Sequence, residues 1–162
     1  MISPVAIIDT REQTPLVFQT IKSEVGTLQT GDYSIRGAEE LFSVERKSVS
    51  DLVGCVTGDN RERFERELHR LRGFWFARIL IVGSELEIAS HRYRSGINPK
   101  SVLHTLWAFE VRYRVPVVFE PDPDKAAKLV ERWIYFFCRE LVKVHDSLAV
   151  GCSDPIPEAT AK

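Results

Sequence analysis

The stretch "SVERKSVSDL", Ser43–Leu52, decides how this chain is expected to fold. It opens as a short apolar strand, carries Glu45, Arg46 and Lys47 in succession, and then shows a helix start with a capping-box pattern at Ser48. Because side chains alternate faces along a strand, Glu45 and Lys47 share one face and Arg46 takes the other. The shared face is either solvent-exposed or the floor of a cleft in which the two charges do chemistry.

Outward from this stretch, apolar runs and turn residues predict one α/β domain with a mixed central sheet and helices on both faces. The strands expected before Lys47 follow one another closely, which predicts an antiparallel meander leading up to that residue. The expected strands lie at 5–9, 25–28, from 33, and at 41–46, 76–84 and 115–122. The expected helices start at Ser48 and cover 61–73, 98–113 (with Asn98 as N-cap and Pro99 at N1) and 124–144. We expect the domain to occupy residues 1–144 and residues 145–162 to form a flexible tail, because their composition is typical of turns and tails.

The composition suits one globular domain, since 44% of the 162 residues are hydrophobic and 28% are charged. No apolar run reaches the roughly 18 residues of a membrane span, and the first residues do not resemble a signal peptide. The cysteines are odd in number and show no CxxC spacing, and the histidines are not paired at metal-ligand spacing. These patterns predict neither a disulfide framework nor a zinc site, and favour a reducing cytosol.

The charges are unevenly distributed along the chain. Residues 1–60 carry 5 basic and 9 acidic side chains, and residues 61–114 carry 11 basic and 6 acidic ones. An acidic first third beside a basic middle is compatible with a carboxylate metal site next to an anion-binding surface. Scattered surface charge explains the same numbers.

Two further carboxylates could converge on Glu45, because Asp9 closes the first expected strand and Asp32 begins the strand that pairs with the ERK strand. Oxygen ligands of this kind suit Mg²⁺ or Mn²⁺. With Lys47 beside a metal-activated water, the natural reaction is hydrolysis of a phosphodiester. The plain alternatives are that Asp9 and Asp32 are turn residues and that Asp51 only caps the helix.

The segments "IIDTRE", "GDY" and "VERKSVSDL" together resemble the nuclease domain of the XPF family, whose signature is a GD followed at a distance by ERK-x-x-x-D. The GD is Gly31–Asp32, the ERK is Glu45–Lys47, and the trailing acid is Asp51. The resemblance covers roughly residues 4 to 143 and implies the restriction-endonuclease-like fold. It also implies a divalent-metal-dependent DNA endonuclease, acting at branched, flap or nicked DNA in repair or recombination. The alternative is a catalytically inactive scaffold of the same fold that binds DNA or a partner.

The resemblance also implies roles for individual residues. Asp32 and Glu45 would hold Mg²⁺, or Mn²⁺ in its place, with the Arg46 carbonyl as a further ligand, and Lys47 would be the catalytic lysine. Asp9 and Glu12 would assist the metal site or hold its ligands in place. Arg11 and Arg46 would support the constellation, and Asp51 would lie near it.

The sequence shows neither the helix-hairpin-helix module nor the helicase domain of larger relatives. We therefore expect a standalone, cytoplasmic, prokaryotic or phage-encoded form, which leaves open a separate targeting subunit.

Basic residues beyond the motif form two groups that could contact DNA phosphates. The helix over 61–73 either faces DNA or is a solvated helix with pairs such as Glu62–Arg66 and Arg63–Glu67. A basic loop near residue 95 lacks interleaved acids and is the more attractive candidate. The residues concerned are Arg61, Arg63, Arg66 and Arg70 on the helix, and Arg92, Arg94 and Lys100 in and after the loop.

Five bulky apolar residues, Trp133–Phe137, occur in succession on the last expected helix. A one-faced amphipathic helix buries only part of its circumference, so this segment is either enclosed within the monomer or meets a partner. Nuclease domains of the XPF family commonly dimerise, so we predict a homodimer through this segment.

Overall fold

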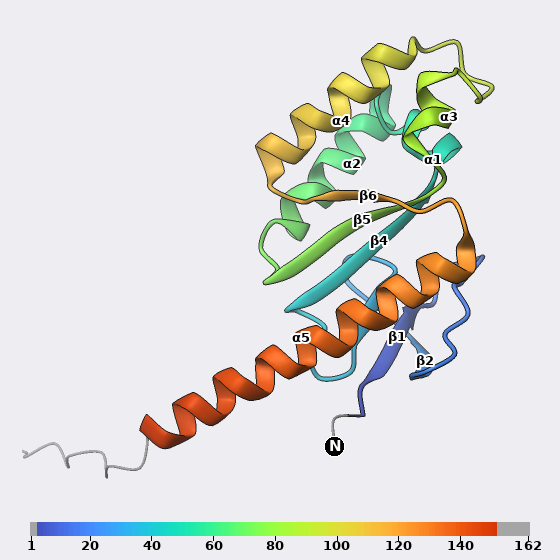
Figure 1. Cartoon of the computed structure of the whole chain (residues 1–162). Helices are drawn as coiled ribbons and strands as arrows, with labels where there is room; N and C mark the ends of the chain where they lie inside the picture. Colours follow the sequence, from blue (N-terminus) through green and yellow to red (C-terminus); the bar gives the residue numbers. More distant parts are fainter. Residues whose placement is uncertain (1–2, 152–162) are drawn as a thin grey trace, which may run out of the picture.

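The computed structural model describes residues 3–151, and at its centre lies a six-stranded sheet in the order β2-β1-β3-β4-β5-β6 (Figure 1). β4, β5 and β6 run parallel to one another, and β1 and β2 are also parallel. β3 is antiparallel to both of its neighbours and joins the two parallel groups. The strands are β1 Val5–Asp9, β2 Lys22–Gly26, β3 Tyr33–Ile35, β4 Phe42–Ser48, β5 Phe76–Val82 and β6 Val117–Phe119.

The predicted antiparallel meander is wrong in one respect, because β2 pairs with β1 and not with β3. The segment after Gly26 instead passes the end of β1, where the Asp9 side chain accepts a hydrogen bond from the Leu28 backbone N–H (2.7 Å). Leu28 is buried. This anchored crossing carries the chain to the other side of β1, where β3 begins.

Helices cover both faces of the sheet, as predicted, and each face has its own core (Figure 1). Alternation along β5 divides its side chains: Ile79 and Ile81 pack among the helices that follow β4, whereas Leu80 packs on the other face with the last helix. The helices are α1 Val49–Gly54, α2 Gly58–Leu71, α3 Glu85–Ala89, α4 Pro99–Tyr113 and α5 Pro123–Gly151. The short α3 was not predicted.

Local signals in the sequence set several helix ends. Ser48 and Asp51 form the predicted capping box of α1, and the Asn98 side chain caps α4 with Pro99 in its first turn. The last helix was predicted to end near residue 144, but it continues to Gly151, and residues 152–162 lie outside the described part of the chain. None of the helices within residues 3–151 is long and apolar enough to cross a membrane.

Candidate active site

The alternation predicted for the ERK tripeptide is confirmed by the contacts of its side chains. Glu45 and Lys47 line the same pocket, and the Lys47 Nζ lies 2.6 Å from Glu45 Oε1. Arg46 contacts Glu12 instead, with its Nε 2.8 Å from Oε2 and a terminal nitrogen 2.9 Å from Oε1. The tripeptide therefore serves two different environments on the two faces of β4.

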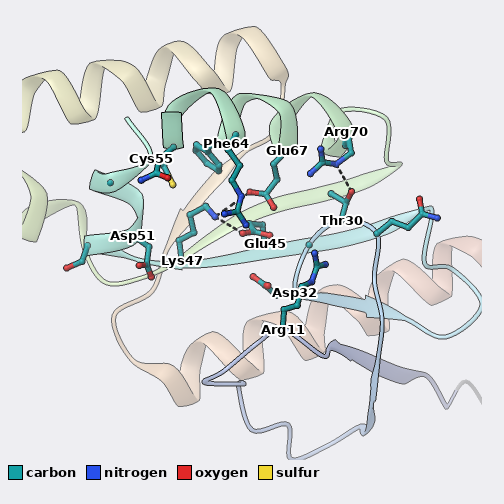
Figure 2. Close-up of a pocket in the computed structure, with 16 residues that line it drawn as sticks. Arg11, Thr30, Asp32, Glu45, Lys47, Asp51, Cys55, Phe64, Glu67 and Arg70 are labelled. Atoms are coloured by element: carbon teal, nitrogen blue, oxygen red, sulfur yellow. Dashed lines mark hydrogen bonds and ion pairs between the residues drawn. The ribbon is translucent and has the colours of Figure 1, made fainter. Parts of the chain in front are cut away.

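The pocket has a volume of about 490 Å³ and lies between β4 and α2 (Figure 2). Its other walls come from α1, from residues 29–32 and from Arg11. Asp32, Glu45 and Glu67 supply carboxylates to it, while Lys47, Arg63 and Arg70 supply cations. Acidic and basic groups from three separate segments thus meet in one cavity.

Asp32 is held in the pocket by its backbone and by the neighbouring strand. Its N–H donates to the Val44 carbonyl (2.9 Å), and the Arg46 N–H donates to its Oδ2 (2.7 Å). Gly31 precedes it with φ +83°, and a Cβ there would collide with the Ser43 side chain, so the close approach requires glycine. Burial raises the pKa of Asp32 to about 6, against the lowering effect of the Arg46 N–H and with repulsion from Glu12 adding to the rise.

Lys47 is enclosed by two carboxylates and an aromatic ring. Its Nζ lies 2.6 Å from Glu45 Oε1, 3.4 Å from Glu67 Oε2 and 4.9 Å from the centre of the Phe64 ring. Burial alone would lower the pKa of Lys47, but Glu45 and Glu67 raise it above its usual value, so the ammonium stays protonated. Burial also raises the pKa of Glu45 well above its usual value, and the nearby charges of Glu67 and Asp32 add to this.

Asp9 and Glu12, which were predicted to assist the metal site or to hold its ligands in place, have other partners in the structure. Asp9 accepts hydrogen bonds from the Arg11 N–H (2.9 Å) and Nε (2.6 Å) at Oδ1 and from the Leu28 N–H at Oδ2. Burial would raise the pKa of Asp9, but these hydrogen bonds bring it below its usual value. Neither carboxylate lines the pocket. Asp9 holds the crossing after β2 and Glu12 holds Arg46, so both are placed as structural residues that hold the site together.

The carboxylates of the pocket decide whether it can hold a divalent cation. Among the side chains that the structure describes, no group of three or more His, Cys, Asp or Glu residues is arranged to hold a metal ion. Asp32 and Glu45 nevertheless offer two desolvated carboxylates in a pocket with room for water, and Mg²⁺ is commonly bound by one or two carboxylates while it keeps several waters. A cation would also relieve the cost of burying these two negative charges, so the donor set fits a hard divalent cation.

Asp51 combines the two roles that the sequence left as alternatives. Its carboxylate accepts a hydrogen bond from the Ser48 hydroxyl (2.6 Å), and its backbone N–H donates to that hydroxyl (3.1 Å). It also lines the pocket. The helix cap therefore places a further acid at the rim.

The basic residues of α2 divide into two groups. Arg63 and Arg70 line the pocket, and the Arg70 Nε donates to the Thr30 hydroxyl (3.0 Å). Arg61 pairs with Glu65, and its guanidinium lies over an aromatic ring of α4. Arg66 pairs with Glu62 at 3.8 Å. Arg61 and Arg66, predicted to contact DNA, are therefore not part of the pocket wall.

The loop before α4 lies near the pocket but does not line it. Arg94 borders a separate hollow together with Ser50 of α1, and Ser50 also lines the main pocket. Arg92 and Lys100 are exposed. Their predicted contacts with phosphate stay predictions.

Glu67 lines the pocket, and its ion-pair partner in the structure differs from the one that the sequence predicted. The predicted pair was Arg63–Glu67, but the carboxylate of Glu67 reaches Lys47. The available signal was spacing: Arg63, Glu67 and Arg70 recur at i, i+4 and i+7 on one helical face. Spacing alone could not show that this face meets β4.

The mixed sheet, its two helical layers and the pocket at β4 define an α/β domain of the restriction-endonuclease-like class, as the sequence resemblance predicted. The model of the ERCC4 domain matches residues 8–132, and the chain belongs to the ERCC4 domain family. No curated protein matches this sequence significantly.

Among solved structures, the fold is similar to that of XPF from Aeropyrum pernix, with a TM-score of 0.68 and 22% identity. The match covers 88% of this chain and 69% of that one. It is also similar to XPF from Aeropyrum pernix in complex with DNA, with a TM-score of 0.65 and 21% identity over 85% of this chain and 66% of that chain. This chain thus spans about two thirds of those chains.

Proposed function

We propose that this protein is a divalent-metal-dependent DNA endonuclease that hydrolyses phosphodiester bonds. The observation that carries the proposal is that Asp32, Glu45 and Lys47 line one buried pocket, with the Lys47 ammonium 2.6 Å from Glu45. Membership of the ERCC4 domain family and the likeness to XPF structures, one of them a complex with DNA, support it. We further propose branched, flap or nicked DNA in repair or recombination as the substrate.

In this proposal, Asp32 and Glu45 hold Mg²⁺, or Mn²⁺ in its place. When held by these carboxylates, the cation would supply a coordinated water of lowered pKa and would neutralise charge on the phosphate. Lys47, kept protonated by its carboxylate neighbours, donates hydrogen bonds to the attacking water or to a phosphate oxygen. The Arg46 backbone N–H and guanidinium hold Asp32 and Glu12 in position, and the Arg46 carbonyl would be a further ligand of the cation.

The rim of the pocket supports a nucleic-acid substrate. Arg11, Arg63 and Arg70 surround the acidic floor, where they would contact phosphates on either side of the bond to be cut. Such contacts position a backbone without reading its sequence. The pocket therefore favours recognition of DNA shape over recognition of bases.

A cleavage assay with Mg²⁺ on flap, fork, nicked and plain duplex DNA tests the proposal. Wild type should cleave, and Lys47→Ala should lose at least about 100-fold in rate. Equal rates for the two proteins would refute the assignment of the site. Binding without cleavage by wild type would favour the alternative function, an inactive scaffold.

We also propose a homodimer through α5, with a narrower contact surface than the sequence predicted. Trp133, Ile134 and Phe137 pack on the sheet, whereas Tyr135 and Phe136 are 43% and 57% exposed. Sedimentation velocity of Phe136→Glu tests this, since a charge at the centre of an apolar interface should shift the protein to monomer. A wild-type protein that sediments as a monomer at all concentrations would contradict it.

A further inference from the structure

One face of α2 carries a charge that a purely phosphate-binding surface would not need. Arg63 and Arg70 line the pocket, and Glu67 lies between them on the same face, also lining the pocket. A carboxylate beside a path for phosphates repels them, so it weakens any binding that the two arginines provide. Its presence there calls for a specific partner.

That partner is Lys47. The side chains of Lys47 and Glu67 are 12% and 20% exposed, and the Nζ and Oε2 atoms are 3.4 Å apart. In Figure 2, Glu67 comes from the helix on one side of Glu45, and Asp32 lies on the other side. The ammonium is therefore in contact with one carboxylate from its own strand and a second from α2.

The two carboxylates differ in what a divalent cation would do to them. Glu45 is a candidate ligand, so its negative charge would be shared with a bound cation, and that cation would itself repel the ammonium of Lys47. Glu67 lies on the opposite side of Glu45 from Asp32, although its charge acts on both carboxylates, and it would keep its charge for Lys47. A lysine without this second anion would be free to swing out of the pocket toward solvent.

We propose that Glu67 is a positioning residue that retains the Lys47 ammonium in the pocket when Glu45 binds the metal. This inference rests on the proposed nuclease function. Glu67 touches neither the substrate nor the reacting atoms, and it acts through Lys47. The face of α2 thus combines phosphate contacts at Arg63 and Arg70 with control of the lysine at Glu67.

The kinetic test compares Glu67→Ala and Glu67→Gln with a matched control, Glu65→Ala. Glu65 lies on the same helix, pairs with Arg61 and Arg112, and does not line the pocket. We expect Glu67→Ala to lower kcat by about 10- to 100-fold with KM changed less than about 3-fold, because a misplaced catalytic group costs rate and not binding. Glu67→Gln, which keeps a hydrogen-bond acceptor, should recover part of the loss, and Glu65→Ala should behave as wild type. Unchanged kcat in both Glu67 variants would overturn the inference.

Two readouts do not depend on cleavage. In protein labelled with ¹⁵N-lysine and saturated with Mg²⁺ in the absence of DNA, the ammonium signal of Lys47, assigned by its loss in Lys47→Arg, should exchange faster with water in Glu67→Ala than in wild type. The loss of Mn²⁺ affinity, measured by calorimetry, should stay below about 100-fold, the upper limit for a residue that does not itself bind the metal. An unchanged ammonium signal would overturn the inference, as would a larger loss of Mn²⁺ affinity, which would make Glu67 a metal ligand. If wild type does not cleave DNA, the proposed function fails, while the ammonium signal still decides whether Glu67 holds Lys47.

Discussion

The substitution Asp32→Asn should stabilise the metal-free protein while abolishing cleavage. Burial raises the pKa of Asp32 from its ordinary 3.8 to about 6, which corresponds to about 3 kcal/mol of unfavourable interaction with the ionised carboxylate at neutral pH. Asparagine removes the charge and still offers an oxygen to the Arg46 N–H, which donates to Asp32 at 2.7 Å. At about pH 8, the free energy of unfolding of the variant should therefore exceed that of wild type by up to about 3 kcal/mol.

The raised pKa of Asp32 makes the stability difference between wild type and Asp32→Asn depend on pH. Because the folded-state pKa lies above the ordinary value, the folded protein binds the proton more tightly than the unfolded chain. The stabilisation of wild type from this carboxyl group is complete below about pH 4 and is lost as the pH rises through about 6. The two proteins should thus be nearly equal in stability at acid pH and diverge above it.

Urea unfolding in EDTA at a series of pH values measures this difference. A matched control is Glu62→Gln, an exposed carboxylate on α2, which should change stability by less than about 0.5 kcal/mol. Added Mg²⁺ should stabilise wild type, by about 2.7 kcal/mol at a concentration 100 times its dissociation constant, and leave Asp32→Asn unchanged. If the variant is no more stable than wild type at alkaline pH without metal, the ionised carboxylate is not costly and the reasoning fails.

Two further predictions concern the supports of the site. Arg46→Ala should lower the free energy of unfolding by about 3–5 kcal/mol in a urea titration, because Glu12 is left buried without its charge partner; a loss below about 1 kcal/mol would contradict this. Gly31→Ala should lower Tm more than Gly37→Ala does, because both glycines have positive φ but only an added Cβ at Gly31 meets a neighbour, Ser43, within the described chain. Equal shifts at the two glycines would show that the close approach costs nothing.

Local patterns predicted much of the fold correctly. The capping signals at Ser48 and Asn98 and the apolar runs of the central strands depend on short-range rules, and the structure agrees with them. The partner of β2 was not predictable in this way, since it depends on the hydrogen bond between Asp9 and Leu28 across a separation of 19 residues. A strand's alternation shows which face is buried and says nothing about its neighbour.

The same distinction applies to the candidate site. The sequence places Asp32, Glu45 and Lys47 together because Asp32 directly precedes β3 and the other two lie on the neighbouring strand, and the structure brings all three into one pocket. It could not show that Asp9 reaches Leu28 and that Glu12 reaches Arg46, because these two partners come from elsewhere in the fold. Glu67 was missed for the related reason that helix packing, not helix spacing, brings it to Lys47.

The consecutive charges of the ERK tripeptide have a structural explanation in the opposite faces of β4. Arg46 donates its backbone N–H to Asp32 and its guanidinium to Glu12, so this single residue connects the segment before β3 and the segment after β1 to the strand that carries Glu45 and Lys47. Two carboxylates with raised pKa values, Asp32 and Glu45, lie in the pocket, and Arg46 contacts the segment that carries one of them and belongs to the strand that carries the other. The arginine between the acid and the lysine therefore ties together the segments that form the pocket, because its buried ion pair with Glu12 lies on the opposite face of the same strand.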